Sequence, residues 1–203
     1  IAADGLDALT QLIEPYTSRS ATPFTDALIE GCFAKAAQAL PIWFETGAQA
    51  HAEQDALAYA AFVSGLGLAL AGLGAVHAMA SPLGGLTEVP HGVACGALLA
   101  PTTAANIRAM HAREPQSAGL SRYAQLGRLL TGESRANQDE ALAALQETLA
   151  TLTRRLKIKG LAAHGLTPER IPTIAQSCSP ASLKNNPITL TQSELEHALT
   201  QAL

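Results

Sequence analysis

The fold is decided by residues Ala56–Met79, which read ALAYAAFVSGLGLALAGLGAVHAM and contain no Asp, Glu, Lys or Arg. An uncharged run of this length is long enough to cross a lipid bilayer. It lacks flanking basic residues and the Trp and Tyr belts of a membrane helix, however, and it is rich in glycine. Small residues allow neighbouring helices to approach closely. We therefore expect a helix buried at the centre of a globular bundle, and no membrane span.

The composition of the whole chain supports the same fold class. Ala, Leu and Gly supply most of the apolar residues, and β-branched residues are sparse. No segment alternates polar and apolar residues with period two. The sequence therefore predicts an all-α fold: one helical bundle domain over residues 1–203, with about seven to nine helices. The net charge is -4 and the basic residues do not cluster. These features argue against binding to nucleic acid or to a membrane surface.

Further helices are predicted on either side of the uncharged run from helical periodicity and from Pro, Gly and capping residues. They cover approximately Leu6–Tyr16, Pro23–Leu40, His91–Met110, Ser121–Leu130, Gln138–Leu156 and a terminal helix to Leu203. Pro15 is expected to end the first of these helices. A loop is expected at Ser81–Pro90. Thr191 and Glu194 have the spacing of a capping box at the start of the terminal helix.

The cysteines indicate a reducing compartment. Cys32, Cys95 and Cys178 are odd in number, far apart and not in CxxC spacing. We expect them to be reduced, mostly buried thiols that act as small core residues in a cytoplasmic protein. The chain begins at Ile1 with a helical pattern and no signal peptide, so we expect a fragment or a cleaved product.

Two histidines and one aspartate are the candidates for chemistry. His77 lies near the end of the uncharged run, and His91 begins the next helix. Imidazole binds Zn²⁺ or Fe²⁺ well, although such a pair taken alone is more often two core histidines. Asp7 and Gln11 are one helical turn apart on one face. Asp7 alone also fits an ordinary first-turn acid. Together, Asp7, His77 and His91 would form a facial set of metal ligands.

Other chemistries find no support in the sequence. It contains no nucleophile elbow, no P-loop and no GxGxxG motif after a strand. The remaining histidines lie in polar contexts and are expected at the surface. They are His51, His111, His164 and His197.

Three segments carry a resemblance to a known family. Gly74–Val93 resembles the histidine signature of the iron-containing (group III) alcohol dehydrogenases. Asp4–Gln11 is similar to the first metal motif of that family, and Asn186–Thr191 to its C-terminal signature. The segments follow the family's order and span nearly the whole chain.

The resemblance implies that the chain is the C-terminal, metal-carrying half of a dehydroquinate synthase-like fold. The N-terminal domain, which binds NAD or NADP in the family, would be absent from this chain. The family holds a divalent metal, Fe or Zn, through an aspartate and histidines. Asp7, His77 and His91 match three of these ligands. Gln11 stands where the family has a fourth ligand, and Ser81 where its signature has a further histidine.

The function that the resemblance implies is metal-dependent, NAD(P)-linked oxidation of an alcohol, or reduction of an aldehyde or ketone. Two alternatives remain open. The first is a metal-independent reductase of the maleylacetate reductase type, which Gln11 and Ser81 favour but Asp7 disfavours, because that branch typically has Asn at this position. The second is a catalytically inert helical fragment. This fragment alone is expected to be inactive. It would expose an apolar face where the absent half packs, so we also expect a homo-oligomer.

Overall fold

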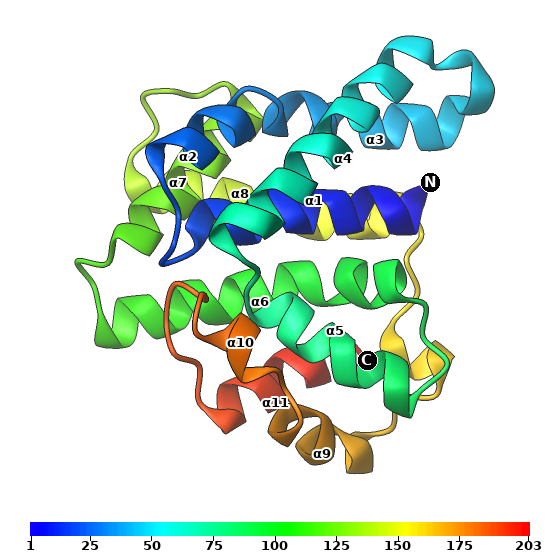
Figure 1. The fold of residues 1–203 in the computed structure, drawn as a ribbon, viewed down its shortest axis with the longest axis vertical. Coiled ribbons are helices and arrows are strands. Elements are labelled where there is room, and N and C mark those ends of the chain that lie inside the picture. The colour runs from blue at the N-terminus through cyan, green and yellow to red at the C-terminus, as the bar shows by residue number, and fades with distance from the viewer.

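The computed structural model describes residues 1–203, and every regular element in it is a helix (Figure 1). The α-helices are α1 (Ala2–Thr17), α2 (Pro23–Glu30), α3 (Phe33–Thr46), α4 (His51–Ala71), α5 (Ala75–Leu86), α6 (His91–Arg113), α7 (Ala118–Thr131), α8 (Gln138–Arg155), α9 (Ile171–Gln176), α10 (Pro180–Leu183) and α11 (Gln192–Gln201). Short 3-10 helices are η1 (Gly47–Gln49), η2 (Leu161–His164) and η3 (Pro168–Arg170). The all-α prediction is confirmed, but there are more helices than predicted, because two predicted helical segments are each divided and short elements such as η1 and α10 add to the number.

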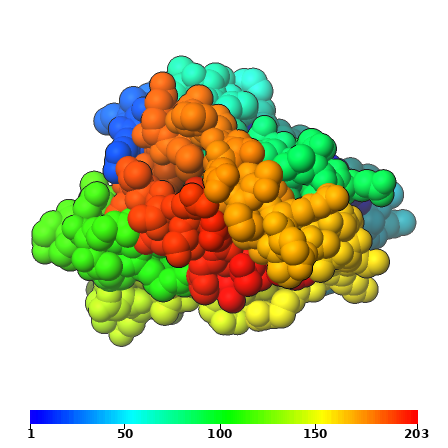
Figure 2. Space-filling model, turned by 90° about the horizontal axis from the view of Figure 1, so that it is seen from below, coloured from blue at the N-terminus to red at the C-terminus, as the bar shows by residue number.

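Helix α1 lies at the middle of the molecule. It packs against α4 on one side and α6 on the other, as Figure 1 shows. Helices α7 and α8 form a pair, α11 lies against α6, and α9 packs against α11 and α5. Figure 2 shows that the C-terminal segment, in orange and red, covers one face of the molecule. A single hydrophobic cluster of 53 buried residues runs through these layers, so the helices share one core.

Capping side chains set several helix starts. Thr191 and Glu194 form the predicted capping box of α11, in which each side chain accepts a hydrogen bond from the other residue's backbone N–H. Asn137 and Glu140 form a second box at the start of α8. These boxes satisfy N–H groups that have no partner within the helix. The predicted helix at Gln138–Leu156 accordingly begins where expected. The predicted helix at His91–Met110 also begins as expected, directly after Pro90 and without a side-chain cap.

The uncharged run Ala56–Met79 is not one helix. Helix α4 ends at Ala71, and the next residue, Gly72, has a φ of +71°, in the left-handed region that glycine adopts without strain. Helix α5 then begins at Ala75 in a new direction. The first turns of α5, residues 75–80, are buried throughout, as predicted for the centre of the bundle.

Helix α4 departs from the prediction, because only one of its faces is buried. Tyr59, Phe62, Leu68 and Leu70 are all exposed, Phe62 by 66%. The composition predicted that α4 would be buried, because its residues are apolar on every face of the helix. Composition does not show how many of those faces are packed against other helices. By length and composition α4 alone could cross a membrane, a property that core helices of soluble proteins share.

Three other boundaries differ from the predictions. The expected loop at Ser81–Pro90 is helical up to Leu86, so only Thr87–Pro90 connects α5 to α6. The predicted helix Pro23–Leu40 is divided at Gly31–Cys32 into α2 and α3. Pro15 lies inside the last turn of α1 and does not end it there. Proline lacks an N–H group but keeps a helical φ, so packing on both sides of a helix can retain it.

Candidate metal centre

Three helices bring four potential metal ligands together. They are Asp7 of α1, His77 of α5, and His91 and Cys95 of α6. One ligand atom from each of these side chains lies within 4.8 Å of all the others. The Oδ1 atom of Asp7 is 3.2 Å from Nε2 of His77 and 3.7 Å from Nε2 of His91. The convergence of Asp7, His77 and His91 is what the sequence predicted.

A close approach of two helices places Asp7 beside the start of α6. A Cβ atom at Gly92 would lie only 2.7 Å from the backbone oxygen of Ala3. No larger residue fits there without moving one helix. Because Gly92 follows His91, this contact sets the first turn of α6 against the first turns of α1. Asp7 and His91 therefore face each other across the contact.

The orientation of His77 is fixed by a buried glutamate. Oε2 of Glu14 lies 2.6 Å from Nδ1 of His77, and Oε1 accepts a hydrogen bond of 2.7 Å from the backbone N–H of Val76. A carboxylate accepts hydrogen bonds, so Nδ1 of His77 carries a proton and its Nε2 faces Asp7. A carboxylate of this kind commonly orients a metal-binding histidine in proteins.

The electrostatics of the cluster follow from these contacts. Burial disfavours the charged form of His77, but hydrogen bonds with Asp7, Cys95 and Glu14 outweigh it and raise the pKa to about 12. Burial also opposes ionisation of Asp7, yet the hydrogen bond and charge of His77 keep the pKa of Asp7 below its ordinary 3.8. Burial raises the pKa of the Cys95 thiol to about 11. Without a metal, the contacts of His77 with Asp7, Cys95 and Glu14 thus favour the charged imidazolium form of its side chain.

The cluster is accessible from one side. His91 is 52% exposed and Asp7 is 22% exposed, whereas His77 is 8% exposed and Cys95 is fully buried. A ligand can therefore reach the cluster past His91, while His77 and Cys95 form its floor.

Gln11, the fourth predicted metal ligand, lies one turn after Asp7 on α1. Its amide oxygen accepts a hydrogen bond of 3.2 Å from the hydroxyl of Ser64 on α4. Ser81 is exposed on α5, one turn after His77. The other histidines are away from the cluster. His51, His111 and His197 are exposed, and His164 is partly buried.

Sequence analysis missed two residues of the site. Cys95 was interpreted as a small core residue, yet it follows His91 by one helical turn on the same face of α6. Glu14 follows Asp7 by two turns on the same face of α1. Helical spacing was the available signal for both residues. It does not reveal which side chains of other helices meet that face.

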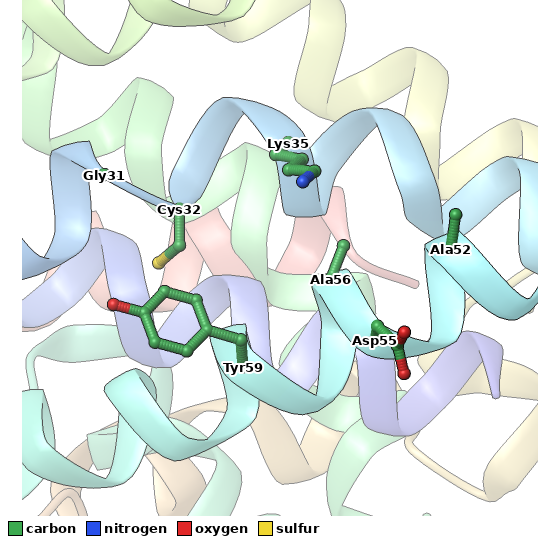
Figure 3. Close-up of a pocket in the computed structure, with 7 residues that line it drawn as sticks. All are labelled: Gly31, Cys32, Lys35, Ala52, Asp55, Ala56 and Tyr59. Atoms are coloured by element: carbon green, nitrogen blue, oxygen red, sulfur yellow. The ribbon is translucent and has the colours of Figure 1, made fainter.

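A separate groove lies between α3 and α4. It has a volume of about 380 Å³ and its lining includes Cys32, Lys35, Asp55 and Tyr59. Figure 3 shows the Tyr59 hydroxyl directed toward Cys32 at one end, with Asp55 toward the other. None of its lining residues belongs to the cluster around His77, so we place the candidate functional site at the cluster and not at this groove.

Comparison with known proteins agrees with this geometry. A sequence profile described as the Fe-containing alcohol dehydrogenase family, C-terminal, matches residues 1–203. The chain is 37% identical over 195 residues to a probable alcohol dehydrogenase, EutG, of Salmonella typhimurium. This alignment covers 96% of this chain and 46% of EutG. The chain spans about half the length of the curated relatives that it matches.

Solved structures show the same relation. The crystal structure of a 1,3-propanediol oxidoreductase matches the whole chain with a TM-score of 0.88 and 28% identity, over 51% of its own length. A sulfoacetaldehyde reductase from Bifidobacterium kashiwanohense, solved in complex with NAD⁺, matches with a TM-score of 0.77 and 26% identity; the match covers 99% of this chain and 49% of that one. The chain therefore belongs to the iron-containing alcohol dehydrogenase family and corresponds to the C-terminal part of its members.

Proposed function

We propose that this chain is the metal-carrying half of an NAD(P)-linked dehydrogenase that interconverts a small alcohol with its aldehyde or ketone. The observation that carries the proposal is the convergence of Asp7, His77 and His91 from three helices. Family membership supports it, since curated relatives include a 1-propanol dehydrogenase and 1,3-propanediol dehydrogenases.

The donor set fits a divalent metal. A carboxylate oxygen and two imidazole nitrogens suit Zn²⁺ or Fe²⁺. A positive ion would also offset the cost of keeping the Asp7 carboxylate partly buried. A bound metal of this kind polarises an alcohol or carbonyl oxygen and favours transfer of hydride to or from the adjacent carbon.

The residues of the chain have separate tasks in this proposal. Asp7, His77 and His91 hold the metal, and Glu14 keeps Nε2 of His77 directed toward it. The exposed side of His91 leaves room for the substrate to enter. Gln11 is hydrogen-bonded to Ser64. We propose that it fixes α4 against α1 and is not itself a strong ligand.

The nicotinamide cofactor requires the other half of the protein. The chain contains no strand, and therefore no strand–turn–helix unit to receive a pyrophosphate. The relatives are about twice as long as this chain, and one structural neighbour was solved with NAD⁺. We propose that an N-terminal domain binds NAD or NADP, that the substrate enters between the halves, and that the enzyme is a cytoplasmic homo-oligomer. The 203 residues would then be one domain.

The test uses the full-length enzyme purified without chelator. We expect a bound divalent metal by elemental analysis and NAD(P)-linked turnover of small alcohols. His77→Ala and His91→Ala should each lose metal and activity together, because each removes a ligand. His111→Ala and His197→Ala, which change exposed histidines, should lose neither. A metal-stripped enzyme that kept its rate would refute the proposal in favour of the metal-independent reductase.

A further inference from the structure

The thiol of Cys95 faces the side chains of the metal cluster and not a backbone carbonyl group of its own helix. Its Sγ atom lies 3.5 Å from Nε2 of His91 and 3.8 Å from Nε2 of His77. The thiols of the other two cysteines donate to backbone carbonyl groups. Cys32 donates to the carbonyl oxygen of Ile29, and Cys178 to that of Ile174, each within its own segment. Cys95 is therefore the one cysteine in the chain that is directed at other side chains.

The spacing of the four donor atoms matches a coordination shell. Tetrahedral zinc bonds of about 2.0–2.1 Å to nitrogen or oxygen and about 2.3 Å to sulfur place the ligand atoms roughly 3.3–3.6 Å apart. Four of the six separations among Asp7, His77, His91 and Cys95 run from 3.2 to 3.8 Å, and all six are within 4.8 Å. A metal would need only small side-chain shifts to contact all four atoms.

The environment of Cys95 favours a bound metal over a plain core thiol. The residue is fully buried, and two imidazole nitrogens and a carboxylate surround its sulfur. A buried polar cluster of this kind is costly unless its members satisfy each other. The neutral alternative on α1, Gln11, has its amide oxygen directed to Ser64. Cys95 is thus the better placed fourth donor.

We propose that Sγ of Cys95 is a direct metal ligand, which completes a four-ligand site with Asp7, His77 and His91 and favours zinc over iron. The inference rests on the proposed metal centre and adds to it the identity of the fourth ligand. A thiolate is a soft donor that Zn²⁺ accepts readily, whereas a set of oxygen and nitrogen donors discriminates less between Zn²⁺ and Fe²⁺. The thiol proton is released to solvent when the metal binds.

Cobalt spectroscopy tests the inference without any assay of activity. Co²⁺ bound by the full-length protein should show an intense near-ultraviolet thiolate-to-cobalt band in addition to its visible absorption. Cys95→Ser and Cys95→Ala should lose the near-ultraviolet band and keep the visible absorption, since three ligands remain. Cys32→Ser and Cys178→Ser should keep both features. Competition titrations should show that Cys95→Ser lowers zinc affinity roughly tenfold or more and narrows the preference for zinc over ferrous iron.

The outcomes separate the two proposals. Visible Co²⁺ absorption without the thiolate band in the wild type would overturn the role of Cys95 and leave the metal centre standing. Absence of any Co²⁺ binding would overturn the metal centre and the inference with it. A thiolate band that persisted in Cys95→Ser but disappeared in Cys32→Ser or Cys178→Ser would also overturn the inference, because the sulfur ligand would be another cysteine.

Discussion

Glu14 uses its two oxygens for two different partners. One accepts the backbone N–H of Val76, in the first turn of α5, and the other accepts Nδ1–H of His77. The side chain is 6% exposed, and a buried carboxylate is stable only when such partners surround it. Because Val76 and His77 are adjacent, one residue of α1 fixes both the start of α5 and the nitrogen that His77 presents to the cluster.

Glu14→Gln should therefore weaken metal binding. An amide has one acceptor oxygen for the two donors, so either Val76 N–H or His77 Nδ1–H loses its partner. We expect zinc affinity to fall roughly 10–100-fold and the free energy of unfolding to fall by about 1–3 kcal/mol. A chromophoric chelator titration and denaturant unfolding measure the two effects. Glu88→Gln, at an exposed position near the cluster in sequence, is the control. Equal affinity in the two variants would contradict this role of Glu14.

At the scale of elements, the end of α6 is tied to the start of α11. Arg113 donates to both carboxylate oxygens of Glu194, at 2.6 and 3.1 Å, and to the backbone oxygen of Thr189 at 2.9 Å. Glu194 also accepts the N–H of Thr191 at 2.7 Å. Burial opposes ionisation of Glu194, but Arg113 and Thr191 outweigh it and hold its pKa below the ordinary 4.5.

The contribution of Glu194 to stability should depend on pH. Its pKa is lower in the folded than in the unfolded chain, so its contribution is fully present above about pH 4.5 and is lost as the pH falls through the folded pKa. We expect Glu194→Gln to cost roughly 0.3–1.5 kcal/mol at about pH 7 and almost nothing at about pH 2. Urea unfolding at both pH values measures the difference. Ser193→Ala on the same helix, which changes an exposed side chain that does not titrate, should show no such dependence. If Glu194→Gln lowered the free energy of unfolding more at about pH 2 than at about pH 7, the lowered pKa of Glu194 in the folded chain would be contradicted.

At the scale of the whole molecule, the exposed face of α4 has no covering layer. Phe62 and Leu70 are 66% and 52% exposed, and Tyr59 and Leu68 extend the same apolar helix. Apolar patches on a monomer commonly mark an interface. Since the curated relatives are about twice as long as this chain, we expect an N-terminal half to cover this face in the full-length enzyme.

The 203-residue chain alone should consequently associate with itself. Sedimentation or light scattering should show a mass that rises with concentration, because burial of the α4 face removes apolar surface from water. Phe62→Gln with Leu68→Gln should reduce the association. Leu86→Gln, which changes an exposed leucine at the end of α5, should leave it unchanged. Association that was insensitive to the α4 variants would place the contact elsewhere.

The predictable and unpredictable parts of the fold have different physical origins. Helical periodicity and capping residues act locally, so the all-α class and the starts of α6, α8 and α11 followed from the sequence. The candidate ligands Asp7, His77 and His91 could be predicted because they stand in recognisable motifs. Contacts between helices are not local. The position of Cys95 beside the two histidines and the exposure of α4 therefore had to come from the structure.

The C-terminal segment also makes a contact with a residue far away in the sequence. Oδ1 of Asn186 accepts the backbone N–H of Ala75 at 3.1 Å, at the first residue of the helix that carries His77, although 111 positions separate the two residues. Asn186 in turn donates to Asn106 and to the carbonyl oxygen of Ile188. A ribosome adding about 5–20 residues per second needs roughly 5–20 s to travel from Ala75 to Asn186. Asp7 is synthesised before Ala75, and His77, His91 and Cys95 follow early in that interval, yet the helix that presents His77 gains this cap only once Asn186 has been made. A frameshift or proteolytic cut just before Asn186 would accordingly disturb the candidate metal centre while leaving all four of its candidate ligands in the chain.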